Sequence, residues 1–486
     1  MQWIEQGLTR RQPWSRAATL AVLVLGVGIP VGALLGLLGG LYGSVALLGL
    51  LAAAIMLRSL MASLLAVIAI ICLLPFAALP VDIGFAPTLL NLALGTLFFI
   101  WIARLVTHRE GALRMDPPAI GVLAFAALAM VSFVAGLSHA ALTANVARRF
   151  GEIILSILSF ILIINVVNTR NRLRLVVGAL ILCGFVAALI GIVLYILPRD
   201  LSIRLLSMLR VVRYPAGPEV LRHIEDNPEA ALRATSTSVD PNVLGGLLVI
   251  VTALTLPHLL VQRPILPRPI IMAMVATMVL CLVLTFSRSS LGGLMVAAFL
   301  LGILRWRRLL WLGVAFLVVL VVLPPARIYV THLIRGLLIG DLATQMRVGE
   351  YRDAIRLISR YPWFGVGFAG TPDIDTYLGV SSVYLLIAQE MGLIGLGNFL
   401  LVLGIFVGRF LMTQRRYPPG SDLEPLLYGC GVAIMGAMVA GLLDHYLFNL
   451  SFPHASTLLW MLLGLGTVSI RLAHREIEQI SAKNTH

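Results

Sequence analysis

Charged residues are scarce in this chain: Asp, Glu, Lys and Arg make up 12% of its 486 residues, and lysine occurs once, as Lys483. A typical globular domain carries roughly 25% charged residues. A chain with about half that share cannot cover a folded core with polar surface on every side. The composition therefore excludes a soluble enzyme and a disordered chain, and the 59% of hydrophobic residues predicts a membrane protein.

Cysteine is also rare, and the chain lacks the common nucleotide-binding motifs. The four cysteines fall within apolar segments and have no metal-ligand spacing, which predicts buried thiols, no disulfides and no metal site. We find no P-loop, no glycine-rich dinucleotide fingerprint and no internal repeat. No cofactor is therefore expected, and the energy for any reaction has to come from the substrate or from an ion gradient.

Fourteen apolar segments dominate the sequence. A helix needs about 20 apolar residues to cross a bilayer, and some of the shorter segments can instead pair as re-entrant hairpins. We predict an all-α polytopic membrane protein with about 12–14 transmembrane helices and two structured extracytoplasmic loops. The segments cover residues 17–38, 41–57, 60–80, 88–106, 119–137, 150–167, 173–197, 242–260, 270–286, 290–304, 310–325, 382–408, 425–443 and 454–472.

The basic residues are distributed unevenly between the two predicted sides of the membrane. With a cytoplasmic N-terminus, more than half of the 36 Lys and Arg residues fall in cytoplasmic segments, and the short outer loops hold only Arg148, Arg149 and Arg288. This is the positive-inside pattern. The formal net charge of +14 therefore reflects topology and does not predict nucleic-acid binding, and both termini are expected in the cytoplasm.

Alternation of the spans places both long polar loops on the outer side. Each loop contains six arginines nearly balanced by acidic residues, so neither is a polybasic lipid-binding patch. Long structured loops often carry function, which places the predicted chemistry outside. The regions are N-terminal helices (1–197, about seven spans), a first extracytoplasmic loop (198–241), central helices (242–325), a large extracytoplasmic loop with an amphipathic helix (326–381), C-terminal helices (382–472) and a cytoplasmic tail (473–486).

The first polar interruption precedes the span at 242–260. Asp240 and Pro241 are residue types typical of an N-cap and a first helical turn, so helix initiation is one explanation for Asp240, Pro241 and Asn242, and substrate binding is the other. Arg233 is not needed for capping. A forked guanidinium beside a helix N-terminus is a favourable anion site. Arg233, Asp240 and Asn242 are therefore candidate substrate-binding residues.

The second interruption is a short connection between two spans, with the sequence Ser287-Arg288-Ser289-Ser290. A charge flanked by apolar residues is unfavourable unless it is paired or faces a wet cavity. The neighbouring hydroxyls favour a cavity in which Ser287 and Arg288 bind an anion. The alternative is an interfacial arginine whose head group reaches the lipid headgroups.

The third interruption is the segment 344–368, whose periodicity predicts an amphipathic helix that ends at Pro362. Arg347 lies near the helix start, where basic charge opposes the helix dipole, so a specific anionic partner is expected there. Arg352 begins a basic row, and the alternative for this row is a helix that lies on the outer leaflet with solvated arginines. The predicted apolar stripe consists of Met346, Tyr351, Ala354, Ile355 and Ile358.

Taken in chain order, these segments resemble the O-antigen ligase/polymerase superfamily (WaaL- and Wzy-type proteins), which includes bacterial polysaccharide polymerases. The similarity is strongest over about residues 233–400 and rests on the order and spacing of several motifs. These are Asp240-Pro241-Asn242, Ser287-Arg288, the Arg347 helix followed by Tyr361–Phe368, and then Tyr384 and Glu390–Leu396.

The resemblance implies a metal-independent glycosyltransferase in the bacterial plasma (inner) membrane, with an extracytoplasmic active site. Its donor would be a glycan on an undecaprenyl-diphosphate carrier, and its acceptor a glycan or lipid-linked glycan, in O-antigen or exopolysaccharide assembly. The expected partners are this donor, the acceptor, the lipid bilayer and a chain-length regulator. Arg288 and Arg347 would stabilise the charge that develops on the leaving diphosphate. The remaining substrate-binding candidates are Arg233, Asp240, Asn242, Ser287, Tyr351, Arg352, Ser381 and Tyr384.

One position departs from the ligase pattern. Ligases carry a His-Asn pair eleven residues before the glycine that corresponds to Gly392, and this chain has Ser381 at that place. Serine cannot act as a base near neutral pH without help. The departure therefore favours a repeat-unit polymerase over a ligase that uses the lipopolysaccharide core.

Other residues can supply the base that the acceptor hydroxyl needs. His445 follows Asp444 at the outer end of a span, although a histidine beside a short loop can equally be structural. Glu390 lies inside a predicted span, where the alternative is a structural ion pair with an arginine such as Arg288. The sequence does not decide whether His445 or Glu390 is the base. Weaker candidates are Asp373 and Asp375.

A lipid-linked-sugar flippase or secondary transporter is the alternative function, because such a protein would be equally hydrophobic. Transporters typically contain duplicated halves with helices broken near the membrane midplane. This chain shows no such duplication and has both large polar loops on one side, which favours the transferase.

Overall fold

The computed structural model describes residues 43, 47, 49–51, 53–81, 84–108, 112–139, 141–322, 342–370 and 379–484. The chain divides into two units, Met1–Ser63 and Leu64–His486. The described part of the first unit is helical at residues 43, 47, 49–51 and 53–58 and at the start of α4 (Leu60–Leu73). The predicted span 17–38 lies outside the described residues.

The second unit is built almost entirely from helices, and each predicted apolar segment from 88–106 onward coincides with one of them. The prediction of an all-α polytopic membrane protein is confirmed. Within the described ranges, seven helices are long and apolar enough to cross a membrane. They are α5 (Leu89–Val106), α6 (Pro117–Gly136), α7 (Ala144–Val166), α8 (Arg170–Ile196), α10 (Pro241–Thr255, extended by the 3-10 turn η5, Leu256–Leu259), α16 (Val383–Arg416) and α18 (Pro453–Asn484).

Shorter apolar helices accompany them: α11 (Arg268–Leu284), α12 (Arg288–Leu304), α13 (Arg308–Val322) and α17 (Glu424–Ala440). α11, α12 and α17 are shorter than the about 20 residues of a full crossing. Their lengths follow from polar interruptions in the sequence. α11 and α12 meet at the segment 285–287, and α17 ends four residues before Asp444. Both interruptions lie at the candidate site described below.

Among the seven long helices, α10 and α18 have the most enclosed apolar windows: 89% of each window is buried, against 39% for α5, α6 and α16. α10 is apolar all round, as expected of a helix surrounded by others, and it packs against α12 and α17. Small residues allow this close approach. A Cβ added to Gly245 of α10 would lie 2.6 Å from Oγ of Ser290 in α12. The helix packing therefore determines where the polar ends of α10 and α12 lie.

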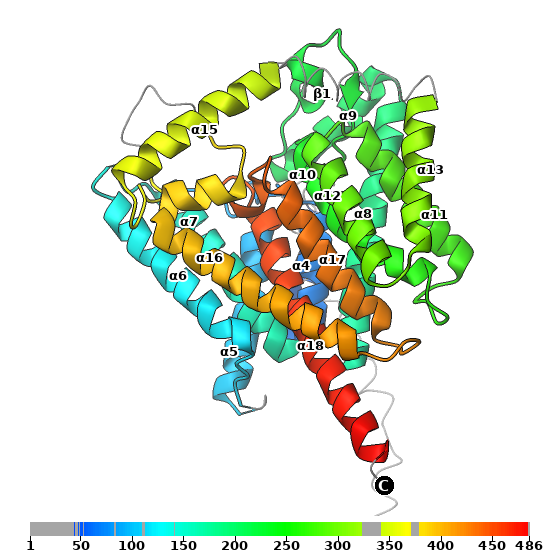
Figure 1. The fold of residues 1–486 in the computed structure, drawn as a ribbon. Coiled ribbons are helices and arrows are strands. Elements are labelled where there is room, and N and C mark those ends of the chain that lie inside the picture. Colours follow the sequence, from blue (N-terminus) through cyan, green and yellow to red (C-terminus); the bar gives the residue numbers. More distant parts are fainter. Residues whose placement is uncertain are drawn as a thin grey trace, which may run out of the picture. The chain divides into compact units, whose positions relative to one another are not determined.

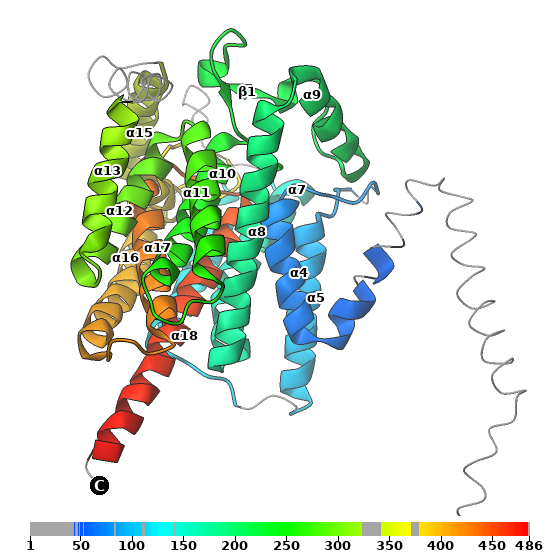
Figure 2. The same ribbon diagram turned by 90° about the vertical axis from the view of Figure 1, so that its right-hand side faces the viewer.

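The segment predicted as the first extracytoplasmic loop is structured and lies at one end of the helices of this unit (Figures 1 and 2). α15 (Leu342–Arg360) lies at the same end, and the C-terminus of α18 lies at the opposite end. The segment contains α9 (Arg199–Met208), the 3-10 turns η2 (Leu209–Val212), η3 (Pro218–Val220) and η4 (Ile224–Asp226), and a two-residue antiparallel hairpin of β1 (Arg222–His223) and β2 (Leu232–Arg233).

α15 is the helix predicted for segment 344–368, and it ends at Arg360, before Pro362. The predicted apolar stripe is confirmed in part: Ala354 is buried, and Ala354 and Tyr351 pack against residues at the start of α16. Met346 and Ile355 of the stripe are 45% and 57% exposed, and the buried Leu357 was not part of it.

α16 is broken at Gly392, where φ is 68° and ψ is −176°. The segment that follows α15 packs against this break. The N–H of Val366 donates to the carbonyl of Gln389 (2.8 Å), and the N–H of Leu393 donates to the carbonyl of Pro362 (2.7 Å). Backbone groups that leave the helix pattern of α16 are thus satisfied by segment 361–367, which an interrupted helix requires in an apolar environment.

We expect Gly392→Ala to destabilise the fold. This φ/ψ combination is accessible essentially only to glycine, and an added Cβ would lie 2.1 Å from the carbonyl oxygen of Trp363. The free energy of unfolding should fall by about 1–3 kcal/mol, seen as a lower Tm by tryptophan fluorescence in detergent. Gly397→Ala is the matched control, because this glycine of α16 has no neighbour within 4 Å of an added Cβ. Equal Tm values for the two variants would contradict the role of the break.

Candidate functional site

A cavity of about 110 Å³ lies at the end of the helices that carries α15 and the β hairpin. Three arginines that are far apart in the sequence contribute to its wall: Arg233 from β2, Arg288 from the start of α12, and Arg347 from α15. Asn242 lines the same cavity from the first turn of α10. The remaining lining residues are Ile224, Glu225 and Phe286.

Arg233 is held in place by two hydrogen bonds. Its Nε donates to the carbonyl of Thr285 (2.8 Å), and Nη2 donates to Oδ1 of Asn242 (2.7 Å). Burial lowers the pKa of Arg233, and the negative charges of Asp240 and Asp444 oppose this effect. An arginine stays protonated near neutral pH even so. The cavity therefore contains a fixed, partly desolvated positive charge.

The prediction that Asp240 and Pro241 begin a helix is confirmed. Oδ1 of Asp240 accepts hydrogen bonds from the N–H groups of Asn242 (2.7 Å) and Val243 (3.2 Å), and Pro241 is the first residue of α10. The cap satisfies backbone donors that a helix start leaves free. It also fixes the turn from which the side chain of Asn242 reaches Arg233.

Arg288 is the first residue of α12, and Ser287 is its N-cap residue. A basic residue at this position opposes the helix dipole and becomes favourable when an anion lies nearby. The serine hydroxyls beside it contact one another: Oγ of Ser287 lies 3.2 Å from Oγ of Ser289 and donates to Oγ of Ser290 (2.9 Å). These buried hydroxyls form a polar layer beside the cavity.

Glu225 and Phe286 line the cavity but were not identified from the sequence. Both have a left-handed backbone, with φ of 55° and 52°, as do Ser236 (52°) and Val239 (59°) in the adjoining segment. Such conformations are unfavourable for residues other than glycine and cluster at functional sites. The residue types Glu and Phe do not predict a left-handed backbone. Neighbouring elements impose this conformation.

Asp444 is the buried carboxylate beside this site. Its side chain is 6% exposed, and Oδ2 accepts a hydrogen bond from Oγ of Ser289 (3.4 Å). Burial raises the pKa of Asp444, and the repulsion of Asp240 adds to this effect, while the charges of His445 and Arg347 oppose it. Arg347 thus lines the cavity and also opposes the rise in the pKa of Asp444.

His445 lies next to Asp444, with Nδ1 3.7 Å from Oδ1 of the aspartate. Its side chain is 27% exposed, and its ring centroid lies 6.0 Å from that of Phe452. Among the described residues, Nδ1 has no hydrogen-bond partner. The arrangement leaves the imidazole available beside the buried carboxylate.

Ser381, Tyr351 and Tyr384 connect helices and do not line the arginine cavity. The hydroxyl of Tyr351 donates to the carbonyls of Ser381 (2.9 Å) and Leu442 (3.2 Å), and the N–H of Ser381 donates to the carboxylate of Glu350 (2.9 Å). The hydroxyl of Tyr384 donates to the carbonyl of Met438 (3.0 Å). These bonds hold α15 against the start of α16, and α16 against the end of α17.

Glu390 and Arg352 lie apart from the cavity. Arg352 is exposed on α15. The backbone carbonyl of Glu390 accepts from the hydroxyl of Ser132 on α6 (2.7 Å), at the break in α16. No ion pair joins Glu390 to Arg288 or to another arginine in the described part of the chain. Asp373 and Asp375 lie outside the described residues. The searched residues also contain no group of three or more His, Cys, Asp or Glu that could hold a metal ion.

Comparison with known proteins supports the resemblance for one part of the chain. Residues 273–400, about a quarter of the chain, match the family model described as O-antigen ligase. The matched region begins in α11 and includes Arg288, α15 and the broken part of α16. No curated protein matches the chain. The multi-pass membrane fold and this match confirm the resemblance found in the motifs: residues 273–400 contain a domain of the O-antigen ligase family.

Proposed function

We propose that this protein transfers a glycan from an undecaprenyl-diphosphate carrier to an acceptor on the outer side of the plasma membrane. The observation that supports the proposal is the group of three arginines, 233, 288 and 347, around one cavity at the N-termini of α10 and α12. Guanidinium groups match phosphate oxygens in geometry and charge, and helix N-termini favour anions.

The chemistry requires positive charge at this place. When the acceptor oxygen attacks C1 of the donor sugar, the bond between C1 and the phosphate oxygen breaks and its electron pair stays on the diphosphate. Preorganised cations stabilise this developing charge in the transition state. The leaving group itself supplies the driving force, so a nucleotide is not needed.

The proton of the acceptor hydroxyl goes to Asp444 in this proposal. Asp444 is the buried carboxylate whose pKa is affected by Arg347, and a raised pKa makes an ionised carboxylate a stronger base. His445 lies 3.7 Å away and can pass the proton to solvent because it is partly exposed. Glu390 is not assigned this role, because its backbone carbonyl is bonded to Ser132 and Gly367 at the break in α16 and no cavity arginine acts electrostatically on its side chain, whereas Arg347 acts on Asp444.

We favour a repeat-unit polymerase over a ligase. Ligases of the family have a histidine at the position of Ser381. Here the backbone of Ser381 is bonded to Glu350 and Tyr351, and serine cannot replace the imidazole as a base. The acceptor of this protein would then be a second lipid-linked repeat unit on the same type of carrier.

Purified protein supplied with radiolabelled lipid-linked repeat units should produce longer lipid-linked chains and free undecaprenyl diphosphate. Label on a different lipid acceptor would indicate a ligase. Movement of the donor across sealed vesicles without bond cleavage would indicate a flippase and contradict the proposal.

Arg288→Ala and Arg288→Lys should each lower transfer by at least about 100-fold, because lysine keeps the charge but not the planar fork. The matched control is Arg356→Ala. This α15 arginine is 53% exposed and pairs only with the neighbouring Asp353 among described residues. Expression and size-exclusion profiles verify folding. Wild-type activity in folded Arg288→Lys would remove Arg288 from the site.

The pH profile tests Asp444. Its carboxylate has to be ionised to accept a proton, so transfer should fall as the pH drops through its raised pKa, at a higher pH than for an ordinary aspartate. Asp444→Asn should lower kcat about 100-fold or more and remove this acidic limb, measured on the residual activity. His445→Gln should keep the limb. An unchanged limb in Asp444→Asn would show that another group titrates.

A further inference from the structure

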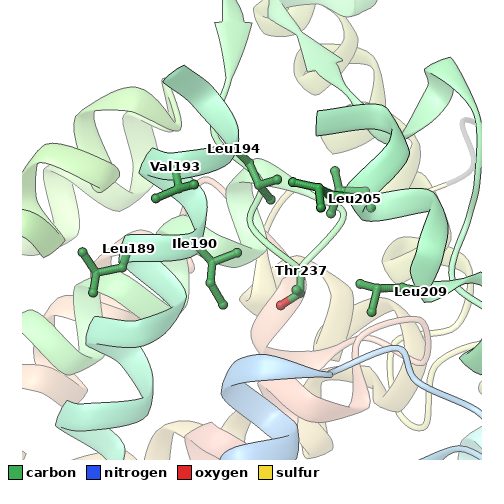
Figure 3. A pocket seen from close by; sticks show the side chains of 8 residues that line it. Leu189, Ile190, Val193, Leu194, Leu205, Leu209 and Thr237 are labelled. Carbon is green, nitrogen blue, oxygen red and sulfur yellow. The ribbon is translucent and has the colours of Figure 1, made fainter. Parts of the chain in front are cut away.

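An apolar groove with a volume of about 350 Å³ lies between α8 and α9. Figure 3 shows side chains of the last turns of α8 on one side and of α9 and η2 on the other, with Thr237 between them. The groove is open along its length, since Val193 of α8 and Leu205 of α9 are 51% and 41% exposed. Its lining residues are Leu189, Ile190, Val193, Leu194, Leu205, Leu206, Leu209 and Thr237.

The groove and the arginine cavity share one stretch of chain as a wall. The chain lines the cavity at Arg233, lines the groove at Thr237, and lines the cavity again at Asn242. Four residues span at most about 14 Å, so the groove begins within that Cα distance of Arg233. The apolar groove and the arginine cavity are therefore neighbours at the start of α10, a membrane-crossing helix.

Thr237 contributes the polar atom of the groove. Thr237 is 7% exposed and Ser236 1% exposed, and neither hydroxyl has a hydrogen-bond partner within the described residues. A buried hydroxyl without a partner is unfavourable and usually has a functional or ligand-related explanation. In Figure 3 the side chain of Thr237 lies among the leucine and isoleucine side chains that form the groove.

We propose that this groove binds the hydrocarbon chain of the lipid carrier next to its diphosphate, with the Thr237 hydroxyl at the boundary between chain and phosphate. This inference rests on the proposed function, because the arginine cavity would hold the diphosphate. Segment 233–237 lines the apolar groove at Thr237 and the arginine cavity at Arg233, as a molecule with a hydrocarbon chain next to a diphosphate requires. The occupant is therefore a long-chain polyprenyl diphosphate, and an ordinary phospholipid is the competing outcome of the test.

Photo-crosslinking tests occupancy without requiring activity. The probe is a sugar-free polyprenyl diphosphate with a diazirine in the isoprene unit nearest the diphosphate, added to the full-length protein in detergent. Label should appear on peptides of α8 and α9, and an excess of unlabelled undecaprenyl diphosphate should remove it. The same excess of phosphatidylglycerol should leave it. Label on other helices, or equal competition by phosphatidylglycerol, would overturn the proposal.

Filling the groove tests its use in transfer. Val193→Trp should raise the KM for an undecaprenyl-linked donor about 10-fold or more and leave the KM for a short-chain diphosphate donor unchanged. Leu175→Trp is the matched control, because Leu175 lies on the same helix with 48% exposure and does not line the groove.

The failures of the two proposals can be told apart. Wild-type transfer with an unchanged KM in folded Val193→Trp would refute the groove but not the transferase. Specific crosslinking in the groove without transfer by the wild type would refute the transferase but not the groove.

Discussion

Mutual repulsion among three arginines is the physical constraint on which the site depends. Arg233, Arg288 and Arg347 line a volume of about 110 Å³, although like charges repel and desolvation disfavours them. The charges of Asp240 and Asp444 offset part of this repulsion at Arg233. The N-termini of α10 and α12 add further positive potential. The fold maintains an arrangement that an anionic ligand would stabilise.

Rigid connections keep the arginines in place without that ligand. Arg233 is bonded to the carbonyl that precedes Phe286 and to the side chain of Asn242, so the β hairpin is tied to the connection between α11 and α12 and to α10. α15 carries Arg347 and is anchored one turn later by Glu350 and Tyr351 to Ser381. Tyr351 and Ser381, which the sequence predicted as substrate-binding residues, thus help to hold the helix that carries Arg347.

The break in α16 belongs to the same framework. Segment 361–367 continues from α15 and fills the interruption at Gly392 with its own backbone hydrogen bonds, and Ser132 of α6 donates to the carbonyl of Glu390 at the same point. The segment after α15 is therefore linked to the two halves of α16 through main-chain groups, and α6 is linked to the same point through the Ser132 hydroxyl. In an apolar environment such bonds are strong restraints, because no water is present to replace them.

The sequence by itself determined the membrane class, the positions of the apolar helices, the cap at Asp240 and the end of α15 before Pro362, because hydropathy, capping and proline geometry act over a few residues. It also identified Arg233, Arg288 and Arg347 as candidate anion-binding residues, from their places near helix starts. It wrongly placed Met346 and Ile355 on the apolar face of α15, and it did not identify the cavity-lining Glu225 and Phe286 or the electrostatic interaction of Asp444 with Arg347. Only the tertiary structure decided these, because they depend on contacts between segments that are far apart in the sequence, and such contacts produce no periodic pattern in the chain.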